Sequence, residues 1–387
     1  MPARGLTLQR PMTRRERLMA TLNGRPVDRP AVNFYEIGGW TPDPEDPDPF
    51  NIYNDPSWRP LLELAEEETD LIRMVSPGTR FRNAGLRRTM FETQETEDSG
   101  SRFYRTTLRI GGRILTWLAR RDPDISTVWA LEHPLKNVAD LKAYLDLPDA
   151  ALDEKIDAAN LLEEDAKVGE RGIVMVDTGD PLCAAAPLFS LENYTVVALT
   201  EPGLFHRLLE KLARPIWART KAVAKAFPGR LWRICGAEYA TPPLLPPRLF
   251  EEYVVRYTGP MVRRIHEGGG FARIHCHGRI RSVLPMIVGM GAAATDPIEP
   301  PPQGDVELGY VRRTYGRDMV LFGNLEVADI ENLAPAAFEK VVARSLREGT
   351  RGPGRGFVLM PTACPYGRKI SARTMANYKT MVRLARM

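Results

Sequence analysis

From residue 171 onward, short apolar runs alternate with helical patterns, and this alternation restricts the fold more than any other feature of the chain. Each apolar run is followed by a segment whose apolar residues recur at helical spacing. The runs lie at 173–176, 231–235, 271–274, 292–295, 319–322 and 356–360, and helices are expected near 202–227, 246–267, 279–290, 305–315, 335–348 and 371–385. Strands that alternate with helices in this way predict a parallel sheet.

Two further strands are expected near the N-terminus, AVNFYE at 31–36 and DLIRMV at 70–75. They bring the number of strand–helix units to eight, which predicts a closed (β/α)₈ barrel of the TIM type in the α/β class. The alternative is an open doubly wound sheet, but no glycine-rich phosphate loop follows the first strand. A barrel with insertions accommodates all of residues 1–387 in a single domain.

Two segments stand outside the repeated units. Thr13 and Glu16 have the spacing of a capping box, and Gly24 follows as a stop signal, which predicts a short helical extension before the first strand. Residues 87–119 alternate polar and apolar side chains and are broken by Ser-Gly and Gly-Gly, a pattern typical of β-hairpins. We predict an antiparallel hairpin insertion at about 80–130 that lies over the main fold.

The charge and cysteine content narrows the class of protein. With 53 basic and 49 acidic residues the net charge is +4, which is not the footprint of a nucleic-acid-binding protein. The four cysteines are widely spaced, which argues against a disulfide framework and favours a reducing, cytoplasmic setting; Cys183 and Cys235 are expected to pack as small hydrophobes. No segment approaches the roughly 20 apolar residues that span a bilayer, and the N-terminus does not resemble a signal peptide. We expect no membrane or nucleic-acid partner.

Almost every predicted strand ends at a polar or ionisable residue. In order they are Glu36, Asp177, Asp180, Glu238, His275, His277, Asp296, Glu299, Asn324 and Cys364. The carboxyl ends of barrel strands form the active face, so these residues are candidates for an active site. Polar residues also occur at strand ends simply because strand ends reach water.

The segment FARIHCHGRI at 271–280 carries the strongest signal for a metal site. Residues i and i+2 of a strand point the same way, so His275 and His277 are expected to face the barrel mouth while Cys276 faces the surrounding helices. Cys364 is expected to reach the same point, with Glu238 as a fourth ligand; histidine, cysteine and glutamate are ligands that zinc prefers. Glu299 is either a substrate contact or a buried partner of Arg279 or Arg281.

Several segments together resemble the uroporphyrinogen decarboxylase-like (URO-D) superfamily. They are TRRERLMATLNGRPVDRPAV, WALEHPLKNVADLKAYL, PPRLFEEYVV, IHEGGG, MGAAATDPIE, LFGNLE and the final GRGFVLMP and NYKTM, spread over residues 13–385. The resemblance implies a single distorted (β/α)₈ barrel with its site in a deep cleft at the C-terminal ends of the strands.

The superfamily has two branches that differ in chemistry. True decarboxylases need no metal and carry an arginine-containing segment after the first strand, whereas this chain has NFYEIGGW at 33–40, with no arginine. The other branch contains cobamide-dependent methyltransferases, which bind zinc through a His-x-Cys pair and a distant cysteine. Here His275 matches the histidine, His277 stands where the first cysteine is expected, and Cys364 matches the last cysteine. A more nitrogen-rich site is a harder Lewis acid, which suits an oxygen- or nitrogen-bound methyl group.

The resemblance therefore predicts a zinc-dependent methyltransferase that moves a methyl group between a small O- or N-methylated substrate, such as a methyl ether, and a corrinoid (methylcobamide) on a separate protein. Zinc is expected on His275, His277, Cys364 and Glu238. Glu238, Glu299 and Asp177 are the expected catalytic residues, and the expected substrate contacts are Tyr35, Glu36, Trp40, Tyr239, Asn324 and Tyr366. A homodimer is compatible with this prediction. The alternatives are a cofactor-free lyase acting on a small acid, and a barrel that binds a metal or corrinoid without turnover.

Overall fold

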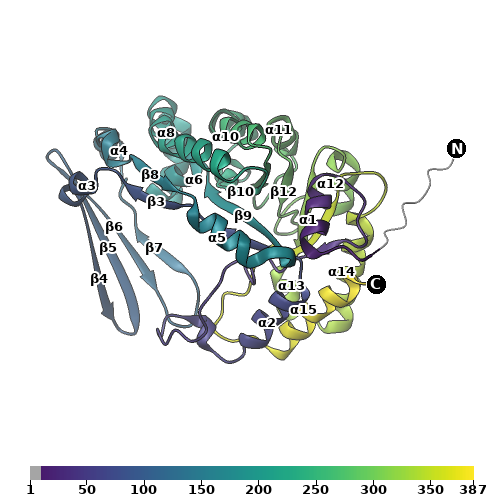
Figure 1. Cartoon of the computed structure of the whole chain (residues 1–387). Helices are drawn as coiled ribbons and strands as arrows, with labels where there is room; N and C mark the ends of the chain where they lie inside the picture. The colour runs from purple at the N-terminus through teal and green to yellow at the C-terminus, as the bar shows by residue number, and fades with distance from the viewer. Residues whose placement is uncertain (1–9) are drawn as a thin grey trace.

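The computed structural model describes residues 10–387, and its centre is a parallel sheet of eight strands curled into a distorted barrel (Figure 1). The strand order is β1-β14-β13-β12-β11-β10-β9-β2, and each neighbouring pair is parallel. The strands are β1 (Ala31–Val32), β2 (Leu71–Val75), β9 (Gly172–Gly179), β10 (Leu231–Cys235), β11 (Phe271–His275), β12 (Ala294–Asp296), β13 (Val320–Leu325) and β14 (Phe357–Pro361). All eight expected strands are present, and the barrel prediction is confirmed.

Helices follow the strands and cover the outside of the barrel. They are α1 (Arg14–Leu22), α2 (Arg59–Glu68), α4 (Val138–Leu145), α5 (Ala159–Val168), α6 (Pro181–Ala185), α7 (Leu191–Thr200), α8 (Pro202–Ala226), α9 (Pro247–Phe250), α10 (Arg256–Glu267), α11 (Leu284–Gly289), α12 (Leu308–Tyr315), α13 (Val327–Asn332), α14 (Pro335–Gly349) and α15 (Ala372–Ala385). The helix expected at 246–267 is instead divided by a π-helical segment, Glu251–Val255. In residues 10–387 no single helix is long and apolar enough to cross a membrane. Segments 181–188 and 191–200 reach the required length and apolar content only when taken together, and the chain bends by 114° between them.

The hydrophobic residues form two clusters because successive strand residues point to opposite faces. One cluster fills the barrel interior and includes Ile173, Leu231, Phe322 and Met360, and the larger one lies between the strands and the helices. Leu18 of α1 belongs to the interior cluster. Arg15 of the same helix bonds to the carbonyl of Gly172, where β9 begins, so α1 covers the N-terminal end of the barrel. The expected Thr13–Glu16 capping box is present.

The first strand is shorter than expected, since β1 ends at Val32 rather than near residue 36. Tyr35 has a positive φ of 59°, and its N–H donates to Asn33 Oδ1 at 2.8 Å. An Asn side chain that accepts a hydrogen bond from the backbone two residues later forms a turn. This turn carries the chain out of the sheet and places Tyr35 and Glu36 at the barrel mouth.

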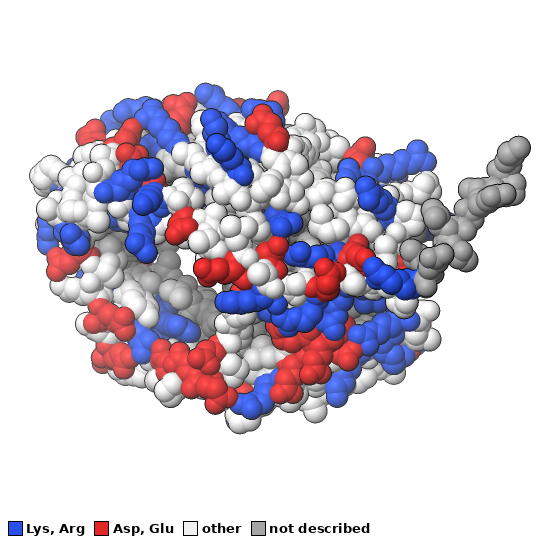
Figure 2. Space-filling model, in the orientation of Figure 1, with Lys and Arg blue, Asp and Glu red and all other residues white. Residues whose placement is uncertain are grey.

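The antiparallel insertion is a four-stranded sheet, which Figure 1 shows at the left of the barrel. It comprises β4 (Phe91–Asp98), β5 (Ser101–Ile110), β6 (Arg113–Arg121) and β7 (Val128–Glu132), and is preceded by α3 (Ala84–Met90). A separate two-stranded sheet, β3 (Gly78–Phe81) with β8 (Glu154–Asp157), lies where the insertion leaves and rejoins the barrel. On the face drawn in Figure 2 a hollow opens between the insertion and the barrel, and charges of both signs are interspersed around it.

Candidate functional site

The pleat of β11 separates the three consecutive candidates His275, Cys276 and His277. His275 alternates with Ile274, which packs on the helical side, so its ring points into the barrel. Cys276 is fully buried in the cluster between strands and helices. The rings of His275 and His277 meet edge to face, with centroids 4.6 Å apart. The structure therefore brings the two histidines together and removes Cys276 from the site, as the strand alternation predicted.

His275 is held by a carboxylate from the neighbouring strand. Its Nδ1 lies 2.8 Å from Oδ2 of Asp296, whose other oxygen lies 2.9 Å from Nε of Arg273. Asp296 and Arg273 are almost completely buried. Burial alone would raise the pKa of Asp296, but Arg273 and His275 outweigh it and lower that pKa to about 2. The ionised carboxylate can only accept, which fixes the ring proton on Nδ1.

His277 is held in the same way by Glu299, which follows β12. Nδ1 of His277 lies 2.8 Å from Glu299 Oε1, and the N–H of Gly278 donates to Oε2 at 2.6 Å. Burial alone would raise the pKa of Glu299, but these two hydrogen bonds lower it; the Glu299 contact likewise raises the pKa of His277 against the effect of burial. The expectation that Glu299 pairs with Arg279 or Arg281 is wrong, because its carboxylate is occupied by His277 and Gly278, and Arg281 contacts Asp305.

Cys364 follows β14 and faces the turn after β1. Its Sγ donates to Oε2 of Glu36 at 2.7 Å. Burial raises the pKa of both groups, and for Cys364 the adjacent Glu36 adds to the effect, so the sulfur is held as a thiol. For Glu36, the nearby His275 acts against burial and lowers the pKa. Tyr35, which directly precedes Glu36 in the chain, stacks on the ring of His275 with the ring centroids 5.9 Å apart. Glu36 thus contacts the thiol of Cys364 directly and lies near enough to His275 to be influenced by it.

Asp177 is bonded to Arg233, which is not among the residues expected at the strand ends. Arg233, in the middle of β10, donates from Nε to Asp177 Oδ1 at 2.7 Å and from Nη1 to the hydroxyl of Tyr35. The registers of β9 and β10 place Asp177 and Arg233 directly opposite each other. Asp177 is therefore part of the barrel wall, where it fixes Arg233 and through it Tyr35.

The remaining candidates surround this centre at different depths. Glu238 lies in the 3₁₀ turn Ala237–Ala240 after β10, accepts from the N–H of Gly236 at 3.1 Å, and its charge acts on His277. Tyr239 is half-buried and packs edge to face on Tyr194. Trp40 and Tyr366 are 41% and 42% exposed on loops after β1 and β14. Asn324 is the next-to-last residue of β13, and its Oδ1 is buried and unbonded to the described residues.

A further ionisable residue, besides Arg233, is absent from the sequence predictions. Glu326 lies two residues beyond Asn324, is buried, and is contacted by the hydroxyl of Thr362 at 3.3 Å. Burial and the nearby charge of Glu299 raise its pKa to about 7. The same i, i+2 spacing that links His275 to His277 could have identified it in the segment LFGNLE.

The histidine pair has the chemistry of a metal site. In both rings Nδ1 is bonded to a carboxylate, and Nε2 has no hydrogen bond to any residue between 10 and 387. Carboxylates that orient histidines through the far ring nitrogen are typical of zinc ligands. Over the same described range no three His, Cys, Asp or Glu side chains are already placed to share one ion. The donor set fits zinc, with Cys364 bonded to Glu36 rather than turned toward the histidines.

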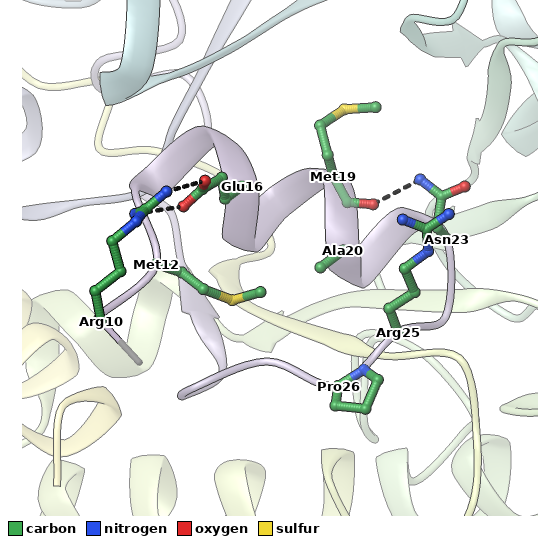
Figure 3. Close-up of a pocket in the computed structure, with 8 residues that line it drawn as sticks. All are labelled: Arg10, Met12, Glu16, Met19, Ala20, Asn23, Arg25 and Pro26. Atoms are coloured by element: carbon green, nitrogen blue, oxygen red, sulfur yellow. Dashed lines mark hydrogen bonds and ion pairs between the residues drawn. The ribbon is translucent and has the colours of Figure 1, made fainter. Parts of the chain in front are cut away.

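A hollow lies elsewhere, against α1 (Figure 3). It has a volume of about 770 Å³ and is lined by Arg10, Met12, Glu16, Met19, Ala20, Asn23, Arg25 and Pro26. Its one carboxylate, Glu16, is paired with Arg10 at 2.5 Å. Because α1 covers the opposite end of the barrel, this hollow does not belong to the histidine site.

The fold and the cluster define a (β/α)₈-barrel protein with a candidate site at the C-terminal ends of its strands. The family model of uroporphyrinogen decarboxylase (URO-D) matches residues 126–382, and the chain belongs to this family. A comparison with curated proteins found no match.

Among solved structures, a methyltransferase from Methanosarcina mazei is 16% identical with a TM-score of 0.59, and the match covers 97% of this chain and 98% of that one. It shares the fold over the whole length. A D-psicose 3-epimerase (13% identity, TM-score 0.30, 64% and 83% covered) and the muconate lactonizing enzyme of Pseudomonas putida (9%, 0.28, 77% and 77%) are much more distant.

Proposed function

We propose that this protein is a zinc-dependent methyltransferase that moves a methyl group between a small O- or N-methylated substrate and a corrinoid carried by a separate protein. The URO-D family membership and the whole-length similarity in fold to the Methanosarcina methyltransferase support the class of reaction. The observation that carries the proposal is the orientation of His275 and His277, each fixed by a carboxylate on Nδ1 with Nε2 left for a ligand.

His275, His277 and Cys364 would hold the zinc. When bound, the metal would supply Lewis acidity toward the heteroatom that gains or loses the methyl group. Glu36 takes the position next to the thiol of Cys364, where it can accept the proton that a cysteine must lose to become a metal ligand. Glu238 lies close enough for its charge to act on His277, and we retain it as the fourth ligand.

The other residues of the mouth would position the substrate. Asp296 and Glu299 keep the two imidazoles in one tautomer, and Asp177 keeps Arg233 against Tyr35. Tyr239, Trp40 and Tyr366 offer aromatic surface for an apolar substrate, while Asn324 offers a buried amide oxygen without a partner among residues 10–387. The half-exposed His277 lies nearer to solvent than His275, with side chains 38% and 8% exposed, and so faces the incoming substrate.

The test measures metal content and methyl transfer on the same preparation. We expect one zinc per chain, and methylation of free cob(I)alamin, followed by its absorbance, with at least one member of a panel of methyl aryl ethers and methylamines. His277→Ala should lose both zinc and transfer. His133→Ala is the matched control and should keep both, because within residues 10–387 the ring of His133 is hydrogen-bonded to nothing but the carbonyl of Pro187.

Other results would contradict the proposal. Wild-type protein without stoichiometric zinc, together with unchanged transfer in His277→Ala, would remove the zinc mechanism. Release of CO₂ from small carboxylic acids without cobalamin would identify a lyase. Tight retention of cobalamin without methyl transfer to or from any substrate would identify a binding protein.

A further inference from the structure

Two cysteines outside the proposed zinc site lie side by side at the barrel mouth. Cys183 is in the first turn of α6, and Cys235 is the last residue of β10. Their sulfur atoms are 3.9 Å apart, and both side chains are only partly buried. Cys276 is fully buried and Cys364 is almost so. The expectation that Cys183 and Cys235 serve only as packed hydrophobes therefore does not account for their position.

The backbone segments that carry Cys183 and Cys235 lie close together. The N–H of Asp180 donates to the carbonyl of Cys235 at 2.9 Å, which ties the start of α6 to the end of β10. A Cβ at Gly236 would lie 2.5 Å from Cβ of Cys183, and a Cβ at Gly179 would lie 3.0 Å from its Sγ. A side chain at either glycine would therefore crowd Cys183 and force it to shift. Glycine on both sides of the contact keeps the two thiols together.

We propose that Cys183 and Cys235 form a reversible disulfide on the wall of the barrel mouth. The oxidant is a small-molecule disulfide such as oxidised glutathione. One protein thiolate attacks it and releases one glutathione, and the second protein thiolate then displaces the other. Two S–H bonds and one S–S bond break, one protein S–S bond forms, and both electrons and both protons leave with two molecules of glutathione.

The bond would lie beside the candidate site. Cys235 is directly opposite His275 in the pairing of β10 with β11. The turn that carries Glu238 and Tyr239 begins immediately after Cys235, so oxidation would tether the start of this turn to α6. The proposal concerns the thiols alone and does not depend on the zinc chemistry.

The experiment uses the full chain, incubated with oxidised glutathione at mildly alkaline pH and then alkylated. Trypsin places Cys183 in the peptide 172–207 and Cys235 in the peptide 234–248. We expect these peptides to appear as one disulfide-linked species that reductant separates. Cys183→Ser and Cys235→Ser should each give a glutathione adduct on the remaining cysteine instead, and Cys276→Ala should behave as wild type.

A second probe is applied to the wild-type protein, so its result does not depend on whether the variants fold. Phenylarsine oxide bridges two neighbouring thiols, and we expect the wild-type protein to bind one equivalent that blocks alkylation of both Cys183 and Cys235. Glutathione adducts without the linked peptide, or full alkylation of both cysteines after either treatment, would overturn the proposal.

Discussion

At the scale of single residues, the candidate site depends on two histidine–carboxylate pairs that differ in their surroundings. Asp296 is shared between His275 and the buried Arg273, so that pair is locked into the barrel interior. Glu299 is shared between His277 and one backbone N–H, in a more open position. Because the second pair has no buried cation to anchor it among residues 10–387, the orientation of His277 depends on Glu299 alone.

The substitution Glu299→Gln tests this dependence. A glutamine has one acceptor oxygen for two donors, so either His277 Nδ1 or the Gly278 N–H loses its partner. We expect zinc affinity to fall by about 10- to 100-fold, the usual effect of removing such a partner. Competition with a chromogenic chelator measures the affinity. Glu307→Gln, at an exposed pair with Arg344, is the control and should change nothing. An unchanged affinity in Glu299→Gln would show that this pair does not support a metal.

At the scale of elements, α6 is anchored through its N-cap, Asp180. This buried carboxylate accepts from the N–H of Cys183 at 2.7 Å and from the hydroxyl of Thr258 in α10 at 2.8 Å. Burial is the larger influence and raises its pKa to about 7, with the nearby charge of Glu238 adding to the effect. The cap therefore joins α6 to α10 in the protonated form at mildly acidic pH.

This raised pKa predicts a pH dependence of stability. An aspartate in the unfolded chain has a pKa of about 3.9. In the folded protein the pKa of Asp180 is about 7, so the folded state binds the proton more tightly than the unfolded chain does. The resulting stabilisation is complete below the pKa of the unfolded chain and is lost as the pH rises through 7. We expect Asp180→Asn to flatten the dependence between pH 5.5 and 8, because its amide does not titrate: the amide oxygen can accept from the Cys183 N–H and the amide nitrogen can donate to the Thr258 hydroxyl. Urea unfolding of both proteins across that range measures it. Parallel curves would contradict the assignment.

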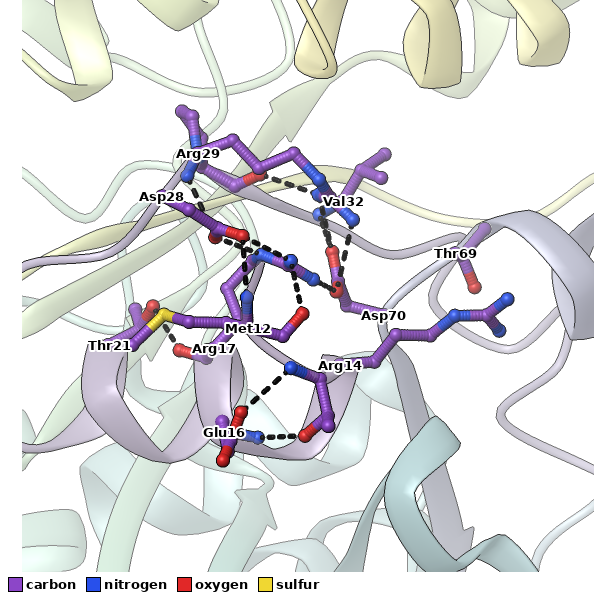
Figure 4. Close-up of polar contacts among 12 residues, drawn as sticks. Met12, Arg14, Glu16, Arg17, Thr21, Asp28, Arg29, Val32, Thr69 and Asp70 are labelled. Carbon is purple, nitrogen blue, oxygen red and sulfur yellow. Dashed lines mark hydrogen bonds and ion pairs between the residues drawn. The ribbon is translucent and has the colours of Figure 1, made fainter. Parts of the chain in front are cut away.

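At the scale of the whole molecule, the barrel closes where β1 and β2 meet, and side chains contribute to this seam. The sheet order ends at β1 and β2 without a ladder between them. The N–H of Asp70 donates to Val32 O at 2.7 Å, and its carboxylate accepts from the Val32 N–H and from Arg17 and Arg29 (Figure 4). Asp70 is fully buried and so joins α1, β1 and β2 at one point.

Asp70→Asn should therefore weaken the entire fold. The substitution removes the fully buried one of the two counter-charges of Arg17, which is itself only 4% exposed, and leaves the partly buried Asp28 as its remaining partner. Breaking a buried ion pair in this way costs about 3–5 kcal/mol of unfolding free energy. Glu45→Gln removes an exposed ion pair with Arg59 and is expected to cost less than about 1 kcal/mol. Chemical denaturation compares the two, and equal losses would contradict the role of Asp70 at the seam.

The eight strands, most of the helices, the capping box of α1 and the opposite orientations of His275 and Cys276 could be predicted from the sequence. Each follows from a periodicity of two or 3.6 residues, or from a short local motif. The insertion was also predicted, although its four strands and α3 exceed a single hairpin. Features set by neighbouring residues could therefore be predicted. The early end of β1 was not predicted, because it depends on a turn in which the side chain of Asn33 accepts from the Tyr35 N–H.

The periodicity of the sequence was enough to predict that this chain forms a barrel with polar and ionisable side chains at one end. Their pairing could be seen only in the folded chain: Glu299 with His277, Glu36 with Cys364, Arg233 with Asp177, and Cys183 beside Cys235. The physical reason is that backbone periodicity sets the direction of each side chain within its own strand. Hydrogen bonds and sulfur contacts between strands depend instead on sheet register and loop geometry, which arise only when distant segments pack together.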